Sequence, residues 1–272
     1  NSPVKGLPQV EPNFKVIQLT PENFTSTFKV ARNIIMSEIS PIYSTAKLAS
    51  ELNKYASGQV IMTVRAPDTV SYINFLRENK EGIVNYILNK EMERMAEWLI
   101  KDNGAPVSRI RQLFGFNIYY PKGLSNITEH PDFYWATNNA PRARKDIVIY
   151  QFPYTSESVF EKDSLIAIRN RVMGKYITGS FDSHMTTAVH SYNPDYRKLE
   201  YNGIFRAELR GLWEMTSDMM GGPFVSHAFV NEKTNMVVVT EVFVFAPETD
   251  KRNLIRNLEG ALYTISFPTE EE

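Results

Sequence analysis

The sequence predicts an α+β fold in which mostly antiparallel sheets are layered by helices. Runs of β-branched and aromatic residues, each of strand length, recur along the chain, and several stop at a proline. Stretches with apolar residues spaced by three and four follow some of these runs. Strands and helices mixed in this way, with short turns between successive strands, favour antiparallel pairing.

Composition limits the class of protein. The chain has 272 residues, 43% of them hydrophobic and 22% charged, which is typical of a globular protein of one or two domains. Thirty basic and 31 acidic residues give a net charge of −1, so we expect no nucleic-acid partner. The absence of cysteine excludes disulfides and thiolate chemistry within these residues.

We expect two α+β halves, 1–104 and 105–272, each of βαββ (ferredoxin-like) type, or one continuous domain.

Three prolines mark expected strand-to-helix switches, because a proline in the first helical turn loses only a donor that would be unpaired anyway. They are Pro21, Pro67 and Pro247. The predicted helices are a stretch carrying Phe24, Phe28, Ala31, Ile34 and Ile35, a long one after Pro67 broken near Gly82 and ending at Gly104, one over Asp163–Met173 closed by Gly174, and one with a stripe from Leu254 to Leu262.

The predicted strand at 203–215 alternates. Phe205, Ala207, Leu209, Gly211, Trp213 and Met215 face one way, and Arg206, Glu208, Arg210 and Glu214 face the other, with Leu212 as the exception. Such a pattern is typical of a half-exposed antiparallel strand. We expect the four charged residues to form a solvated face, with a ligand or partner surface as the alternative.

The segments 223–230 and 236–246 predict a hairpin through the polar loop 231–235. If Val230 faces Met236, then His227 faces Val239, and Glu241 lies diagonally on the same face. That face would also carry Trp213, Met215 and Val225. A histidine beside a carboxylate can act as an acid or base near neutral pH. The competing interpretation is a satisfied polar pair at the edge of a core, and a one-residue slip would put either residue on the opposite face.

The stretch "RGLWEMTSDMMGGPFVSHAF" (210–229) combines a tryptophan, three methionines, two adjacent glycines and a histidine. We interpret Gly221, Gly222 and Pro223 as turn residues and Met219–Pro223 as a tight corner. Methionines in such a segment more often fill a core than bind a ligand.

Familiar catalytic signatures are missing: the sequence holds no GxGxxG, P-loop, GxSxG or HExxH motif. The four histidines are scattered, and in an extended segment His184 and His190 would lie too far apart to share a metal. We therefore expect no metal site and no cofactor, while an enzyme that uses carboxylates would leave no local motif.

Four segments resemble one family: "FKVIQLTPENFTSTFKVARNI" (14–34), "NKYASGQVIMTVRAP" (53–67), "RGLWEMTSDMMGGPFVSHAFVNE" (210–232) and "FVFAPETDKRNLIRNLEGALYTISFP" (243–268). They are similar to lipoproteins of gut anaerobic (Bacteroidetes-type) bacteria that are classed only as a domain of unknown function. The resemblance implies export, an extracytoplasmic location, and a lipid anchor to the cell envelope, in the periplasm or outer membrane, through an N-terminal cysteine outside this sequence. It implies no activity and no site residues.

These observations lead to two hypotheses on function. The first is a non-catalytic binding or assembly module of the bacterial cell envelope, whose partner is an unknown envelope protein or ligand. The second is an envelope hydrolase that uses carboxylates or the His227–Glu241 pair. The residues offered as a ligand-binding surface are Trp213, His227, Glu241, Arg206, Glu208, Arg210 and Glu214.

Overall fold

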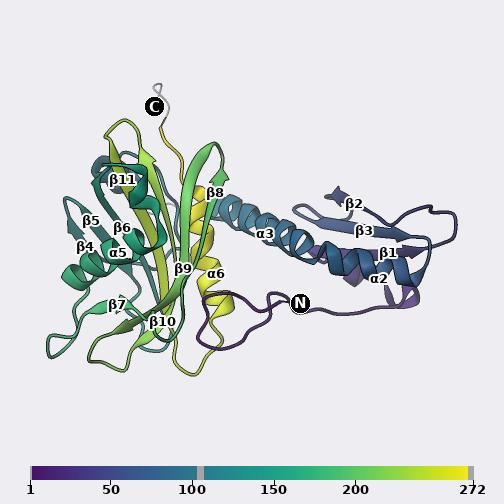
Figure 1. The fold of residues 1–272 in the computed structure, drawn as a ribbon, viewed down its shortest axis with the longest axis horizontal. Coiled ribbons are helices and arrows are strands. Elements are labelled where there is room, and N and C mark those ends of the chain that lie inside the picture. The colour runs from purple at the N-terminus through teal and green to yellow at the C-terminus, as the bar shows by residue number, and fades with distance from the viewer. Residues whose placement is uncertain (1, 103–106, 269–272) are drawn as a thin grey trace. The chain divides into compact units, whose positions relative to one another are not determined.

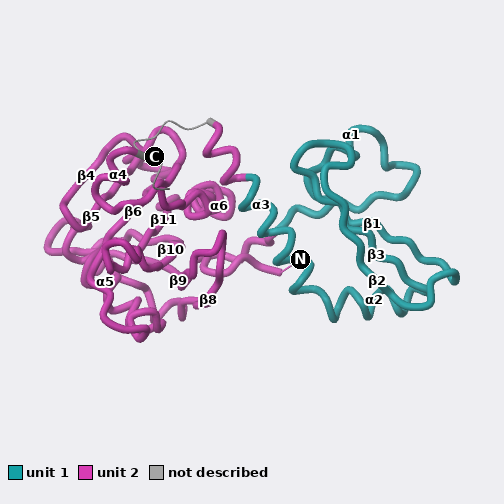
Figure 2. The backbone as a smooth tube through the Cα atoms, turned by 90° about the horizontal axis from the view of Figure 1, so that it is seen from above, with its two compact units in different colours: residues 1, 14–94 teal, residues 2–13, 95–272 magenta. Residues whose placement is uncertain are grey.

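A computed structural model describes residues 2–102 and 107–268 and confirms the α+β class (Figure 1). The chain forms two compact units (Figure 2). Unit 1 contains residues 14–94, and unit 2 contains residues 2–13 together with the chain from Met95 onward. The change of unit falls inside a long helix at Arg94 and Met95. The predicted boundary and helix end at Gly104 lie outside the described residues.

Unit 1 holds a three-stranded sheet of order β1-β3-β2, in which β1 is parallel and β2 antiparallel to β3. No helix separates β1 from β2 in the chain order, which differs from the βαββ arrangement suggested above. Its elements are η1 (Pro21–Asn23), α1 (Ser26–Lys29), β1 (Asn33–Ile39), β2 (Lys47–Leu52), β3 (Val60–Ala66), α2 (Thr69–Glu78) and the first part of α3 (Lys80–Asp102).

The helix expected through Ile34 and Ile35 was wrong. Only the single turn of α1 forms there, and the two isoleucines belong to β1, paired with Ile61 and Met62 of β3. β-branched side chains suit a pleated sheet better than a helix, and the sheet ladder outweighs the chance helical spacing of the apolar residues. Pro21 does stand at the start of a helix, a 3-10 turn, but no strand precedes it.

The core of unit 1 lies between one face of its sheet and α3. Val60 and Met62 of β3 pack against Ile83 and Ile87 of α3. The predicted break in the helical stretch after Pro67 is present, and it falls at Asn79, between α2 and α3. α2 starts where the carboxylate of Asp68 accepts a hydrogen bond from the main-chain N–H of Ser71 at 2.8 Å, a standard N-cap.

Unit 2 is built on an eight-stranded sheet with order β4-β5-β6-β11-β10-β9-β7, and β8 pairs with β9 beside this path. Every pairing in it is antiparallel. Its elements are α4 (Val107–Phe114), β4 (Asn126–His130), β5 (Phe133–Thr137), β6 (Arg144–Pro153), η2 (Glu157–Phe160), α5 (Lys162–Tyr176), β7 (Met185–Thr187), β8 (Asp195–Tyr201), β9 (Ile204–Met215), β10 (Gly221–Asn231), β11 (Met236–Phe245), α6 (Arg252–Glu259) and η3 (Gly260–Thr264).

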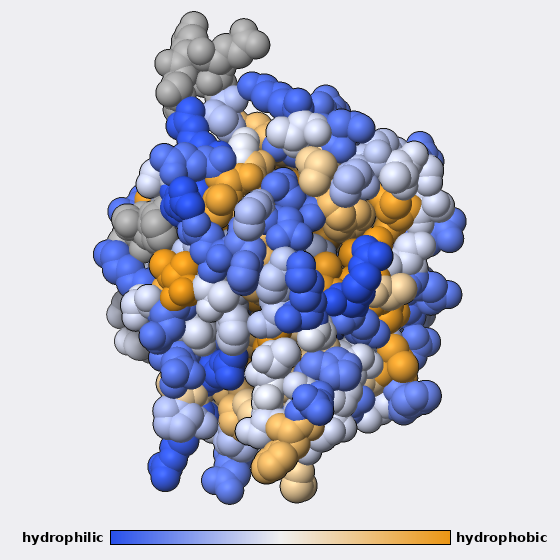
Figure 3. Space-filling view, turned by 90° about the vertical axis from the view of Figure 1, so that its left-hand side faces the viewer, coloured by the Kyte–Doolittle hydropathy of each residue, from blue (hydrophilic) through white to orange (hydrophobic). Residues whose placement is uncertain are grey.

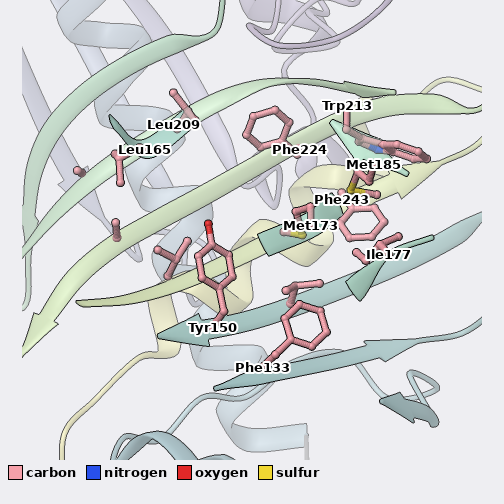
Figure 4. Close-up of a cluster of buried hydrophobic side chains, with 14 of the residues drawn as sticks. Phe133, Tyr150, Leu165, Met173, Ile177, Met185, Leu209, Trp213, Phe224 and Phe243 are labelled. Atoms are coloured by element: carbon pink, nitrogen blue, oxygen red, sulfur yellow. The ribbon is translucent and has the colours of Figure 1, made fainter. Parts of the chain in front are cut away.

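The central strands of unit 2 are buried on both faces. One face packs its apolar side chains against α5, as Figure 4 shows for Met173 beside Phe243 and for Leu165 near Leu209. The other face lies under α6 and η3, whose Ile255, Leu258, Ala261, Leu262 and Tyr263 are all buried. The predicted stripe of this last helix is confirmed from Ile255 onward.

The α5 prediction needs one correction. The helix does not end at Gly174 but continues to Tyr176. Gly174 is instead a point of close contact, because a Cβ there would lie 3.2 Å from the ring of His184.

The N-terminal segment 2–13 is part of unit 2. The carboxylate of Glu11 accepts hydrogen bonds from the main-chain N–H groups of Lys251 at 2.7 Å and Arg252 at 2.9 Å, at the start of α6. A carboxylate in this position satisfies otherwise unpaired donors and complements the helix dipole. α6 is therefore capped by a residue 240 positions away in the sequence.

The surface is mixed. On the face shown in Figure 3, hydrophilic side chains predominate and apolar ones form small separate patches. Among residues 2–102 and 107–268, no helix has the length and apolar character that crossing a bilayer requires.

Candidate functional site

The charged face of β9 lies inside unit 2, beneath α6 and η3. Arg206 is 0% exposed and Glu208 is 4% exposed, and the side chain of Arg210 is 14% exposed. The predicted alternation along the strand is correct, but the expected solvated face was wrong. The polar face of β9 is covered by α6 and η3, which supply charged and aromatic side chains that contact it.

Glu208 is the centre of this network. Arg197 of β8 binds its two carboxylate oxygens through Nε at 2.8 Å and Nη2 at 2.9 Å. His227 Nε2 lies 3.2 Å from Oε2, and Arg210 Nε lies 3.7 Å from Oε1. Burial alone would raise the pKa of Glu208, but Arg210, His227 and Arg197 hold it well below its ordinary value. Glu208 is therefore a buried carboxylate that is charged and paired.

Arg210 links the strand to α6. Its guanidinium donates to both carboxylate oxygens of Glu259, through Nη1 at 3.2 Å and through Nη2. Burial would lower the pKa of Arg210, but Glu259 and Glu208 raise it further above its ordinary value. A fork-shaped donor set between two carboxylates fixes the position of α6 on the sheet.

Arg206 is the least satisfied member of the network. Its Nη1 donates to the main-chain carbonyl of Leu262 and lies 3.4 Å from His227 Nδ1. Its Nε and Nη2 find no hydrogen-bond acceptor among the described residues. The ring of Tyr201 lies under the guanidinium at 5.2 Å, an ordinary cation–π distance. Burial lowers the pKa of Arg206 to about 10, although Tyr263 and Tyr201 oppose this shift.

The expected His227–Glu241 pair was wrong by one residue of register. His227 pairs with Thr240, and Glu241 pairs with Ser226. Because side chains alternate across a sheet, this shift puts His227 on the α6 face and Glu241 on the α5 face. His227 instead meets Glu208, its partner across the β9–β10 ladder, and its ring lies 5.5 Å from that of Tyr263. Burial lowers the pKa of His227, although Glu208 opposes the shift.

Glu241 forms its own ion pair on the α5 face. Arg169 of α5 donates from Nε at 2.9 Å and from Nη2 at 2.7 Å, and its Nη1 donates to Thr187 Oγ1 at 3.0 Å. The guanidinium also stacks 3.9 Å from the ring centre of Phe224. Burial raises the pKa of Glu241, and Arg169 opposes this rise. The pair is fully buried, and its charged atoms are satisfied by hydrogen bonds to each other and to Thr187, which is typical of a structural ion pair.

The remaining predicted residues also separate. Trp213 lies on the α5 face with Met215, opposite His227, and donates from its indole N–H to the carbonyl of Val244 at 3.2 Å. Glu214 lies at the end of β9, paired with Gly221 and Thr186. The structure therefore joins Arg206, Glu208, Arg210 and His227 in one network and excludes Trp213, Glu214 and Glu241 from it.

The expected corner is displaced by a few residues. Gly221, Gly222 and Pro223 are the first residues of β10, and the turn before them comprises 216–220. Neither glycine has the positive φ that the turn interpretation implied. Of the methionines, Met215 and Met220 pack on the core, whereas Met219 is fully exposed.

Several members of the two networks were missed by sequence reasoning, namely Arg169, Arg197, Glu259 and Tyr263. A signal existed for Arg169, because it occupies the same helical stripe as the buried Leu165 and Met173, four residues to either side. Arg197 and Glu259 carry no such mark, because their partners, Glu208 for Arg197 and Arg210 for Glu259, are identified only once β8 and α6 are placed against β9.

The chemistry available to this site is limited by its burial. A histidine within hydrogen-bond distance of a carboxylate could transfer a proton, but His227 is 0% exposed and both carboxylates beside it are held by arginines. In the part of the chain that the structure describes, no group of three or more histidine and acidic residues is placed to hold a metal.

The chain belongs to a family described as a domain of unknown function (DUF4837), whose model matches residues 104–264. A second model, also a domain of unknown function (DUF8532), matches residues 1–99. No curated protein matches the chain.

Two solved structures are similar to part of it. A protein of unknown function from Pseudomonas aeruginosa is 11% identical with a TM-score of 0.32, over 57% of this chain and 99% of that one. A protein from Bacteroides thetaiotaomicron is 15% identical with a TM-score of 0.31, over 58% of this chain and 47% of that one.

Proposed function

We propose that the chain is a non-catalytic binding or assembly module of the bacterial cell envelope, exported and held there by a lipid anchor. The resemblance of four segments to envelope lipoproteins motivates the location. The binding role depends on an observation in unit 1, whose small sheet leaves large apolar side chains in contact with solvent.

Four of these side chains share one face of the sheet. Ile35 and Ile39 of β1 are paired with Met62 and Ala66, and Leu48 and Leu52 of β2 are paired with Val64 and Val60. Since paired neighbours point to the same side of a sheet, all four belong to the face that α3 covers at its centre. They are 51%, 45%, 37% and 49% exposed, respectively. An apolar rim of this kind is typical of a surface that binds a partner.

The catalytic alternative named His227 and Glu241 as its residue pair. These residues lie on opposite faces of the sheet, and Glu241 forms an ion pair with Arg169. Our proposal therefore assigns the buried charges a structural role in holding α6 on the sheet, and it assigns binding to unit 1.

A pull-down from envelope fractions tests the binding role. We expect Ile35→Ser together with Ile39→Ser to lose a partner that the unchanged protein retains. Ile127→Ser is the matched control, since Ile127 is 48% exposed on β4 of unit 2. Equal retention by all three proteins would contradict the assignment to unit 1.

Two further experiments test the class and the location. A screen of glycosidic, ester and peptide substrates should show no turnover, and turnover lost in a folded His227→Ala variant would support the hydrolase instead. Labelling the full-length precursor with a fatty-acid probe should mark its N-terminus in the membrane fraction. An unlabelled protein in the cytosol would contradict the envelope location.

A further inference from the structure

The edge strand β2 of unit 1 is exposed along its whole length. All six of its residues, Lys47–Leu52, are exposed, and within its sheet the strand pairs with β3 alone. Figure 1 shows it as the outermost strand of this sheet. By contrast, β1 at the other edge is partly buried at four of its seven residues. β2 therefore offers main-chain donors and acceptors to another strand.

β2 carries few of the features that normally protect a sheet edge. Proteins block such edges with proline, with bulges, or with inward-pointing charges. β2 (KLASEL) contains no proline, and its pairing with β3 is continuous from Lys47 to Leu52 without a bulge. Its single lysine stands at the first position. The strand is thus long and regular enough to add another strand in register.

The sequence of β2 is complementary to itself. When two copies are placed antiparallel around a two-fold axis at Ala49, Lys47 of each copy stands opposite Glu51 of the other. Lys47, Ala49 and Glu51 share one face, because their β3 partners are Arg65, Thr63 and Ile61. Both cross-strand pairs therefore join opposite charges on the same side of the sheet, with only the small Ala49 between them.

The side chains on the other face of β2 also fit this antiparallel arrangement. Leu48 of each copy would stand opposite Ser50 of the other, and the two Leu48 side chains would lie diagonally across the axis. Each copy would thereby cover part of the exposed Leu48 of its partner. Glu51 now pairs with Lys54 at 2.8 Å, but both side chains are about half exposed, so the carboxylate can exchange to Lys47 of the partner.

We propose that β2 pairs with β2 of a second copy of this chain, antiparallel and centred on Ala49, so that two three-stranded sheets join into one of six strands. This inference goes beyond the proposed function, because it needs neither an envelope location nor a ligand. An edge of six residues is a small interface, and we expect a dimer that dissociates on dilution.

Charge reversal on β2 tests the pairing. Because the two-fold axis doubles each contact, Lys47→Glu and Glu51→Lys should each raise the dissociation constant about tenfold or more, measured by sedimentation equilibrium. The double variant Lys47→Glu/Glu51→Lys should restore dimerisation, and the exposed Lys80→Glu should leave it unchanged. A monomer at all concentrations, or a double variant no better than the single ones, would overturn the proposal.

Engineered cysteines test the register. The chain contains no cysteine, so each introduced thiol is unique. Ala49→Cys should form a disulfide-linked dimer on mild oxidation, because the two Cβ atoms face each other at the axis. Ser50→Cys should link far less, since its two copies are diagonal neighbours about 7–8 Å apart. Preferred linking at Ser50 would place the axis there, with Leu48 opposite Leu52, and would overturn the arrangement centred on Ala49.

Discussion

The indole N–H of Trp213 donates to the main-chain carbonyl oxygen of Val244, with a distance of 3.2 Å between Nε1 and O. Gly222 lies beside this bond, paired with Trp213 across the β9–β10 ladder. A Cβ on Gly222 would stand 3.2 Å from Nε1 and would overlap the carbonyl oxygen of Val244. Glycine is therefore required here by the close approach of two neighbouring strands and a tryptophan.

From this relationship we expect Gly222→Val to lower the free energy of unfolding by about 2–4 kcal/mol, through overpacking and loss of the indole hydrogen bond. A urea melt of the unchanged protein and the variant measures this. Gly82→Ala is the control: nothing lies within 4 Å of its Cβ position in α3, and alanine should be neutral or slightly stabilising. An unchanged midpoint for Gly222→Val would contradict the geometry.

Acid should destabilise unit 2 through His227. Burial lowers the pKa of this side chain in the folded state, whereas an unfolded histidine titrates at about 6.5. Between these two values the unfolded chain binds more protons, so the free energy of unfolding decreases as pH falls below about 6.5. Glu208 acts in the same direction at lower pH, because its pKa is lowered and its contribution disappears as pH falls through that value.

Urea melts at several pH values test this sign. We expect His227→Gln, which cannot be protonated, to reduce the loss of stability between pH 7 and pH 5 by on the order of 1 kcal/mol. His190→Gln, at an exposed position, should leave the pH dependence as it is. Identical pH profiles for all three proteins would exclude His227 as the source of the acid sensitivity.

Removing one charge of the Arg169–Glu241 ion pair should lower the free energy of unfolding more than replacing both charged side chains with apolar ones. Arg169→Met leaves the carboxylate of Glu241 buried without its partner and should lower stability by about 3–5 kcal/mol. Arg169→Met together with Glu241→Leu removes both charges, and we expect it to recover at least about half of that loss. Chemical melts of the two single variants and the double variant complete the cycle. Additive losses would mean that the two side chains are not coupled.

Glu11 should stabilise α6 from the far end of the chain. Glu11→Ala removes the acceptor of two main-chain N–H bonds, at 2.7 and 2.9 Å, and should cost about 1–2 kcal/mol. Glu157→Ala, an exposed residue of η2, should change stability by less than about 0.5 kcal/mol. Equal melting temperatures for Glu11→Ala and the unchanged protein would show that segment 2–13 does not support the helix.

Local physics already determined much of the chain. The α+β class, the hairpin of β10 and β11, the alternation along β9 and the stripe of α6 each follow from periodicity or turn chemistry that a few neighbouring residues express. For the same reason, Arg206, Glu208 and Arg210 could be assigned to one face of their strand. His227 could be singled out as a polar residue in an otherwise apolar strand.

What surrounds those residues was decided by tertiary structure alone. The observed pairing of β10 with β11 differs by one residue from the expected one, and it puts His227 and Glu241 on opposite faces. The local pattern could not select the register, because both faces of these strands are largely apolar. The isoleucines of β1 join a sheet because β3 supplies their hydrogen bonds. The charges of β9 become buried because α6 brings Glu259 over them and Arg197 reaches Glu208 from β8. Each outcome depends on a partner distant in sequence, which no local pattern contains.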